Sequence, residues 1–237
     1  KGWPLYEKRL SSDTSIRKFI GGQRIQLAPD WDGQSRPESL LVIGEQGLGD
    51  QIFFSSMLAD LHAQQPGSAV CVEPRLVPLL QRSLPGLRFI DGSQIQDQTY
   101  DAQVYLGSLG KLYRPDHASM ERVRPYLKAA PQRRAELRRR IKQDGRLVCG
   151  LSWVSKNQEF GAGKSLDLQS LLPALAVSGI DFIDLQYGDT RDERHDLEAK
   201  HGIHITHLDD VDCTNDIDDL AALVDACDIV MRVSKTT

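Results

Sequence analysis

The sequence predicts an α/β protein with two domains, each built on a parallel sheet. Short apolar runs rich in β-branched residues alternate with helical patterns along most of the chain. A glycine-rich turn follows the first of these runs, and the alternation starts again after a strongly basic segment near the middle of the chain. Strands that alternate with helices at this spacing indicate parallel strands joined by helical crossovers. We therefore expect two successive Rossmann-like domains, and 237 residues with 40% hydrophobic content suffice for both.

Residues 1–38 are predicted to be a connecting extension that precedes the first domain. Only residues 3–10 suggest a short helix, and the aromatic residues of this stretch are scattered among charged and turn residues: Trp3, Tyr6, Phe19 and Trp31. Large aromatic side chains in such a segment are expected to bury against a neighbouring surface. The extension should therefore be pinned to another part of the protein.

The first domain, residues 39–126, opens with a strand over 40–43, a turn with three glycines in six residues, and a helix. Glycines at such a turn let backbone N–H groups approach a ligand, and the start of a helix favours an anion there. The helix is expected to open on Asp50, whose carboxylate would repel a pyrophosphate. Ile52 also replaces the third glycine of the dinucleotide-binding fingerprint. We interpret the turn as one that positions a catalytic acid or base. The alternative is that Asp50 only caps the helix.

Three more strands are expected in the first sheet, and a short helix is expected near residues 76–83. The strands are expected over residues 68–73, 87–90 and 102–106. Ligands of open α/β sheets bind at the carboxyl ends of the strands. Residues 47–50 and 107–110 should therefore line one cleft.

The second domain, residues 127–237, repeats the alternation. Strands are expected over 147–153, 182–185, 203–205 and 229–233, and helices over 166–177, 191–200 and 217–226. The basic run at 131–146 is interpreted as the solvated face of a helix, because an RNA-binding stripe would contain interleaved aromatic residues. The aspartate-rich stretch from Leu208 to Asp228 lacks the spacing of an EF-hand, so we expect helix caps there and no metal site.

Five motifs together resemble glycosyltransferase family 9, the heptosyltransferase-like group, and in particular its tetratricopeptide-linked bacterial branch. These motifs are Gly44–Ile52, Gly150–Trp153, Lys164–Leu166, Leu185–Asp189 and Thr214–Asp218. The resemblance implies the GT-B fold, with the acceptor on the first domain, the nucleotide-sugar on the second, and the working cleft between them. It also implies upstream tetratricopeptide repeats and elements after Thr237 that complete the nucleotide pocket. The second domain is therefore expected to be incomplete here, and this piece alone to be inactive.

The resemblance assigns roles to individual residues. Asp50 becomes the catalytic base. Lys164 becomes the cation that stabilises the departing phosphate, and Lys156 is the second candidate for this role. The alternative for both lysines is that they are ordinary surface residues. Lys235 departs from the asparagine of the family's diphosphate-binding turn. The nucleotide-sugar side comprises Trp153, Lys156, Asn157, Ser165, Gln186, Tyr187, Ser234, Thr236 and Thr237. The acceptor side comprises Gly47, Gly49, Gln51 and Ser108. Alternatively, the stretch around Tyr187 is only a turn, with Tyr187 packed as wall.

The implied activity is inverting, metal-independent transfer of a sugar from a nucleotide-sugar to a hydroxyl of a saccharide or protein, with the donor as substrate and no cofactor. Two alternatives remain: a nucleotide-sugar epimerase of the same fold, and a non-catalytic interaction module attached to tetratricopeptide repeats. A net charge of −4 gives no basic field for nucleic acid. No apolar run reaches the roughly 20 residues of a membrane span, and no signal peptide opens the chain. With four widely spaced cysteines, these features lead us to expect a cytoplasmic protein.

Overall fold

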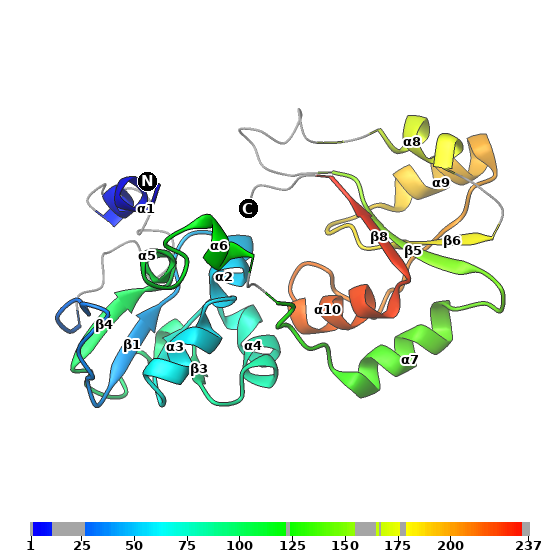
Figure 1. The fold of residues 1–237 in the computed structure, drawn as a ribbon. Coiled ribbons are helices and arrows are strands. Elements are labelled where there is room, and N and C mark those ends of the chain that lie inside the picture. The colour runs from blue at the N-terminus through cyan, green and yellow to red at the C-terminus, as the bar shows by residue number, and fades with distance from the viewer. Residues whose placement is uncertain are drawn as a thin grey trace. The chain divides into compact units, whose positions relative to one another are not determined.

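The computed structural model describes residues 2–10, 27–121, 124–154, 165, 167–175 and 179–233. The chain divides into two compact units, the first ending at Leu127 and the second beginning at Lys128 (Figure 1). Each unit contains a four-stranded sheet in which the strand pairs are parallel. The α/β class with parallel sheets predicted from the alternation is therefore confirmed.

The first sheet has the strand order β3-β2-β1-β4. The N-terminal segment forms α1 (Trp3–Tyr6) and the 3₁₀ helix η1 (Glu7–Leu10). The elements that follow are β1 (Leu40–Ile43), α2 (Leu48–Ser55), α3 (Leu58–Gln64), β2 (Ala69–Cys71), η3 (Pro74–Leu76), α4 (Val77–Ser83), β3 (Arg88–Ile90), η4 (Gly92–Gln94), β4 (Ala102–Tyr105), η5 (Leu106–Ser108), α5 (Leu109–Tyr113) and α6 (His117–Met120). The strand order reverses between β1 and β4, and a crevice for ligands is expected at such a reversal.

All four residues of β1 are buried, and β1 lies in the middle of the sheet between β2 and β4. Its Leu41 and Ile43 share one core cluster with Ala69 and Cys71 of β2. A central parallel strand buried on both faces has no polar alternation. For this reason the apolar run at 40–43 was recognisable as a strand.

The start of α2 corrects one expectation. The helix begins at Leu48, and Gly47, in extended conformation, is its N-cap. Asp50 therefore occupies the third position of the helix, where its carboxylate accepts a hydrogen bond from the Gly47 N–H at 3.3 Å. The expectation that the helix opens on Asp50 is wrong, because the glycine before Leu48 already provides the extended residue that a helix start needs.

The second sheet has the same topology, with the order β7-β6-β5-β8. Its elements are α7 (Pro131–Ile141), β5 (Leu147–Ser152), α8 (Leu168–Leu175), β6 (Ile180–Asp184), α9 (Arg191–His201), β7 (Ile205–Thr206), α10 (Ile217–Ala226) and β8 (Ile229–Arg232). The strand expected over 203–205 is shifted, because only Ile205 and Thr206 pair with β6. The reversal of strand order lies between β5 and β8.

Several arginines in the basic run of α7 pair with the aspartate-rich stretch. Arg133 Nε lies 2.6 Å from Asp219 Oδ1, and Arg138 Nη2 lies 2.6 Å from Asp228 Oδ1. Asp210 is paired with Arg140 at 2.7 Å. The run is therefore a largely solvated face, as predicted, and three of its arginines also pair with aspartates that lie far away in sequence.

These pairs predict acid sensitivity of the second unit. The hydrogen bond from Arg140 holds the pKa of Asp210 well below its usual 3.8, and the hydrogen bond from Arg138 does the same for Asp228. A carboxyl whose folded pKa is depressed stabilises the fold fully above its unfolded pKa and loses that contribution as the pH falls. The melting temperature measured by calorimetry should therefore fall from about pH 4 downward. Asp228→Asn should show a smaller fall, and Asp144→Asn, at an exposed position, the full fall.

Candidate functional site

The carboxyl-terminal edge of the first sheet carries the turn that joins β1 to α2. Gln46 in this turn has a positive φ of 64°, and it is the one non-glycine residue with positive φ in the described part of the chain. This left-handed conformation costs a residue with a Cβ atom roughly 1 kcal/mol. Gly44 is needed for a different reason, because a Cβ there would lie 2.8 Å from the Cys71 carbonyl oxygen. The backbone of β2 and the turn after β1 therefore approach more closely than any side chain allows.

Three predicted residues of this turn lie at the start of α2. Gly47 is the N-cap, and Gly49 and Asp50 are half-buried in the first helical turn. Asp50 makes the helix-start contact described above and remains partly accessible to solvent. The alternative that Asp50 stabilises the helix start is thus compatible with the structure, and it does not exclude a second role for a partly exposed carboxylate.

Gln51, predicted on the acceptor side, is only 1% exposed. Its Oε1 accepts a hydrogen bond from the Glu73 N–H at 2.9 Å, which ties α2 to the residues that follow β2. A hollow of about 490 Å³ lies beside it at the carboxyl ends of β1, β2 and β3. Its lining residues are Gln46, Gln51, Glu73, Pro74, Asp91, Gly92 and Ser93.

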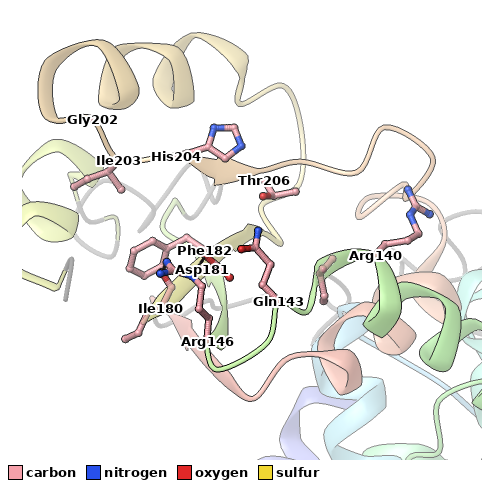
Figure 2. Close-up of a pocket in the computed structure, with 11 residues that line it drawn as sticks. Arg140, Gln143, Arg146, Ile180, Asp181, Phe182, Gly202, Ile203, His204 and Thr206 are labelled. Carbon is pink, nitrogen blue, oxygen red and sulfur yellow. Dashed lines mark hydrogen bonds and ion pairs between the residues drawn. The ribbon is translucent and has the colours of Figure 1, made fainter. Parts of the chain in front are cut away.

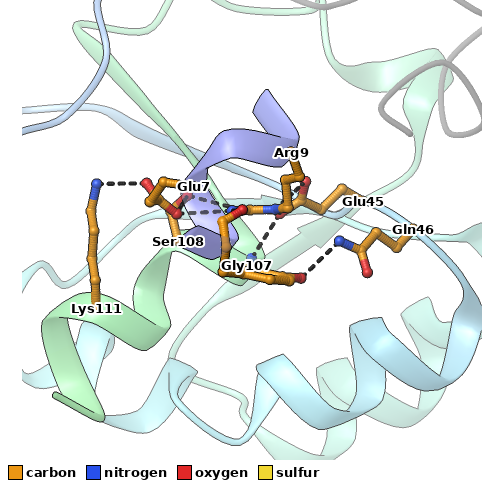
Figure 3. Close-up of polar contacts among 8 residues, drawn as sticks. Glu7, Arg9, Glu45, Gln46, Gly107, Ser108 and Lys111 are labelled. Carbon is orange, nitrogen blue, oxygen red and sulfur yellow. Dashed lines mark hydrogen bonds and ion pairs between the residues drawn. The ribbon is translucent and has the colours of Figure 1, made fainter. Parts of the chain in front are cut away.

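Ser108, the other predicted acceptor-side residue, is buried beneath the N-terminal segment. Its Oγ donates to Glu7 Oε1 at 2.9 Å and accepts from Arg9 Nη2 at 3.0 Å (Figure 3). Arg9 also binds the carboxylate of Glu45, with Nε at 3.1 Å from Oε1 and 3.2 Å from Oε2. The crevice between β1 and β4 is therefore occupied by the Arg9 guanidinium.

The pair of Arg9 and Glu45 was not found from the sequence. Their side chains are 8% and 1% exposed, and Glu45 also accepts the Gly107 N–H at 3.1 Å. Burial raises the pKa of the Glu45 carboxyl, and the hydrogen bonds and charge of Arg9 offset part of that rise. One signal was available: a glutamate two residues after a fully apolar strand needs a buried partner.

In the second unit, the two loops that contain most of the predicted donor-binding residues begin at the ends of the adjacent strands β5 and β8. Ser152, the last residue of β5, is paired in register with Arg232, the last residue of β8. The loop after β5 leads toward residues 155–164, and the chain after β8 continues from Val233 to residue 234. Six predicted residues lie outside the described residues: Lys156, Asn157, Lys164, Ser234, Thr236 and Thr237. Ser165 is described and half-buried.

Trp153 and Gln186 are buried in the structure. Trp153 is 2% exposed, and its Nε1 donates to Glu193 Oε2 at 2.7 Å. Gln186 Oε1 accepts three hydrogen bonds, each 3.0 Å long, from Ser152 Oγ and from the N–H groups of Trp153 and Val154. Its amide therefore holds the loop after β5, rather than standing open to a ligand.

Replacing Gln186 by leucine should destabilise the second unit by about 1–3 kcal/mol, because two buried N–H groups lose their acceptor. Urea unfolding of the variant would measure the loss. Gln143→Leu makes the same chemical change at an exposed position of the second unit and serves as the matched control. Equal stability of the leucine variant and wild type would show that the amide does not support this loop.

The alternative interpretation of the stretch around Tyr187 agrees with its local structure. Gly188 has a φ of 86°, and Asp189 Oδ1 accepts the Arg191 N–H at 3.0 Å just before α9 begins. Tyr187 is half-buried. The stretch is thus a turn with a helix cap, placed at the carboxyl end of β6.

A polar network beside this turn was also missed from the sequence. Asp184, the last residue of β6, has a fully buried side chain and accepts a hydrogen bond from Thr190 Oγ1. His207 Nδ1 lies 2.9 Å and Arg194 Nε 3.4 Å from Asp184 Oδ2. These contacts connect β6, α9 and the residues after β7, so they set the shape of the carboxyl-terminal edge.

A hollow of about 430 Å³ lies at the opposite, amino-terminal edge of the second sheet (Figure 2). Two arginines that line it are already paired: Arg146 Nε is 2.6 Å from Asp181 Oδ1, and Arg140 is bound to Asp210. The predicted donor residues follow the opposite ends of the strands. This hollow is therefore distinct from the predicted site.

In the described ranges, no three His, Cys, Asp or Glu side chains are grouped as a metal site would require. Likewise, none of the helices described here has the length and apolar character needed to cross a membrane.

The chain is similar in sequence to one longer protein and similar in fold to two solved structures. No protein-family profile matches the chain. Protein FlbA of Caulobacter vibrioides is 30% identical over 259 residues; the alignment covers the whole chain but only 42% of FlbA, so the chain spans less than half of that relative.

Two solved structures are similar to the chain at low sequence identity. ADP-heptose lps heptosyltransferase II of E. coli has a TM-score of 0.56 at 14% identity, covering 83% of this chain and 79% of that one. A glycosyl transferase family 9 protein from Veillonella parvula DSM 2008 has a TM-score of 0.50 at 12% identity, covering 82% and 74%. The chain therefore has an α/β fold with parallel sheets similar to that of glycosyltransferase family 9 structures.

Proposed function

We propose that the chain is the transferase part of a heptosyltransferase-like glycosyltransferase, which moves a sugar from a nucleotide-sugar to an acceptor hydroxyl with inversion and without a metal ion. The observation that carries this proposal is the pairing of Ser152 with Arg232 at the ends of β5 and β8. Because of this pairing, the two loops that contain the predicted phosphate-binding residues begin side by side. They begin at the reversal of strand order, where such sheets bind ligands. The similarity in fold to glycosyltransferase family 9 structures supports the same assignment.

In this proposal the first unit holds the acceptor. Asp50 takes the proton of the acceptor hydroxyl while that oxygen attacks the anomeric carbon. The bond from the anomeric carbon to the diphosphate oxygen breaks as the new C–O bond forms, and a single displacement inverts the configuration. The half-exposed position of Asp50 in the first turn of α2 supports this role, because a base must reach its substrate.

The second unit holds the donor in the same proposal. Lys164 stabilises the charge that develops on the departing nucleoside diphosphate, and Lys156, Asn157, Ser165, Ser234, Thr236 and Thr237 bind its phosphates. Tyr187 is proposed to stack against the nucleobase of the donor. Because the Gln186 amide is engaged with the loop after β5, we assign it the support of that loop.

Thermal melting of the full-length protein with nucleoside diphosphates and their glucose conjugates, and with ADP-heptose, tests the proposal. A ligand at 100 times its Kd stabilises the folded state by about 2.7 kcal/mol. At least one donor should therefore raise the melting temperature by several degrees. Conversion of a donor without any acceptor would favour the epimerase, and no shift with any of them would favour a non-catalytic module attached to tetratricopeptide repeats.

A further inference from the structure

The N-terminal segment, residues 3–10, fills the crevice between β1 and β4 of the first unit. Arg9 reaches Glu45 and Ser108 there, and Tyr6 accepts a hydrogen bond from Gln46 Nε2 at 2.7 Å (Figure 3). Trp3 Nε1 donates to the Arg114 carbonyl oxygen. The segment thus contacts the loops that follow both strands at the reversal of strand order.

Two glycines of the first unit leave space for this segment. A Cβ at Gly107 would lie 2.7 Å from Glu45 Oε1 and 3.0 Å from Arg9 Nη2. A Cβ at Gly110 would lie 2.2 Å from Trp3 Cη2. The distances to Glu45 and to the Trp3 ring are too short for packed atoms, so the docked segment requires glycine at 110, and its partner Glu45 requires glycine at 107.

The segment also holds the strained residue of the turn. Gln46 has its backbone in the left-handed region, and its side chain is bonded to the Tyr6 hydroxyl. Burial raises the pKa of Tyr6 to about 12, so this hydroxyl stays protonated and neutral. Arg9 lies over the Tyr6 ring, 4.1 Å from its centroid, and pairs with Glu45, the residue just before Gln46. The segment therefore holds in place both residues that precede the N-cap Gly47.

We propose that Tyr6 and Arg9 are positioning residues of the transferase: by holding Gln46 and Glu45, they fix the turn that presents Asp50. This inference rests on the proposed function of Asp50. It predicts that transfer requires the docked segment, although none of its residues needs to touch the substrate.

The test uses two different disruptions of docking in the full-length protein. Arg9→Met combined with Glu45→Gln removes the ion pair without leaving a buried charge unpaired, and Gly110→Ala displaces the Trp3 ring while the charges stay. Lys111→Ala, which removes the exposed partner of Glu7, and Gly2→Ala, at an open position, are the controls. Hydrogen exchange is measured at residues 46–50 and at β2. Kinetics are measured with the nucleotide-sugar that gives the largest thermal shift.

Both disruptions should accelerate exchange at 46–50 roughly 10-fold or more while β2 stays protected. They should lower kcat about 10- to 100-fold, because a small misplacement of a reacting group has effects of this size. The KM for the donor, which binds the second unit, should stay within about 2-fold of wild type. The two controls should match wild type in exchange and in kcat.

Each outcome decides between the possibilities. Unchanged exchange at 46–50 in both disrupted proteins overturns the inference and leaves the proposed function standing. Faster exchange with unchanged kcat also overturns it, because the segment would then be only structural. A wild-type protein that consumes no donor overturns the proposed function, and the positioning role with it, whatever the exchange rates show.

Discussion

Arg9→Ala is expected to lower the free energy of unfolding of the first unit by about 3–5 kcal/mol, the usual loss when one partner of a buried ion pair is removed. Glu45, 1% exposed, would retain the Gly107 N–H but lose every contact from the guanidinium. Release of the N-terminal segment would hydrate the carboxylate, so the segment should exchange its amide hydrogens first. Urea-dependent hydrogen exchange of β1 measures the loss within the first unit alone.

Lys111→Ala is the matched control for Arg9→Ala. It removes the ion pair between Lys111 and Glu7, which also anchors this segment. The side chains of Lys111 and Glu7 are 44% and 22% exposed. Exposed pairs contribute about 0–1 kcal/mol because water already solvates both charges. If Arg9→Ala cost no more than Lys111→Ala, the buried pair would not stabilise the first unit in the way described.

Asp50→Asn is expected to lower the rate of sugar transfer by about 10²- to 10⁴-fold, the range for removal of a general base. Asparagine has the same size and still offers an oxygen to the Gly47 N–H, so the start of α2 should be preserved. The loss should therefore appear in kcat, with the melting temperature close to wild type. Steady-state release of nucleoside diphosphate in the presence of acceptor measures it.

Asp97→Asn provides the control for Asp50→Asn, since it makes the same chemical change at an exposed position of the first unit. It should retain full transfer. If Asp50→Asn also retained full transfer, Asp50 would be confined to its role at the helix start, and another group would have to accept the proton.

The elements with local signals were predictable from the sequence. The helix over 217–226 was found at its observed bounds, because Asp216 caps it and accepts the Asp219 N–H at 2.9 Å. The fully apolar run at 40–43 could only be a buried strand. In both cases, the residues that decide the structure lie within one or two turns of the element itself.

The contacts that shape the candidate site could not be predicted, because they join residues far apart in the chain. Arg9 and Glu45 are 36 residues apart, and Arg9 and Ser108 are 99 apart. Ser108 and Gln51 were assigned to the acceptor side from their motif positions, but burial and hydrogen bonding decide what such side chains can reach. Gln186 was assigned to the nucleotide-sugar side for the same reason. Only the folded chain brings its amide beneath the loop after β5.

A radiolabelled sugar shows directly whether this fold transfers sugar from a nucleotide to an acceptor. Full-length protein would be incubated with each labelled nucleotide-sugar and with the proteins and saccharides of the cells that naturally make it. Wild type should form acceptor-bound label, with one nucleoside diphosphate released per sugar, and Asp50→Asn should not. Bound label formed equally by both proteins, or by neither with any donor, would contradict the proposed function.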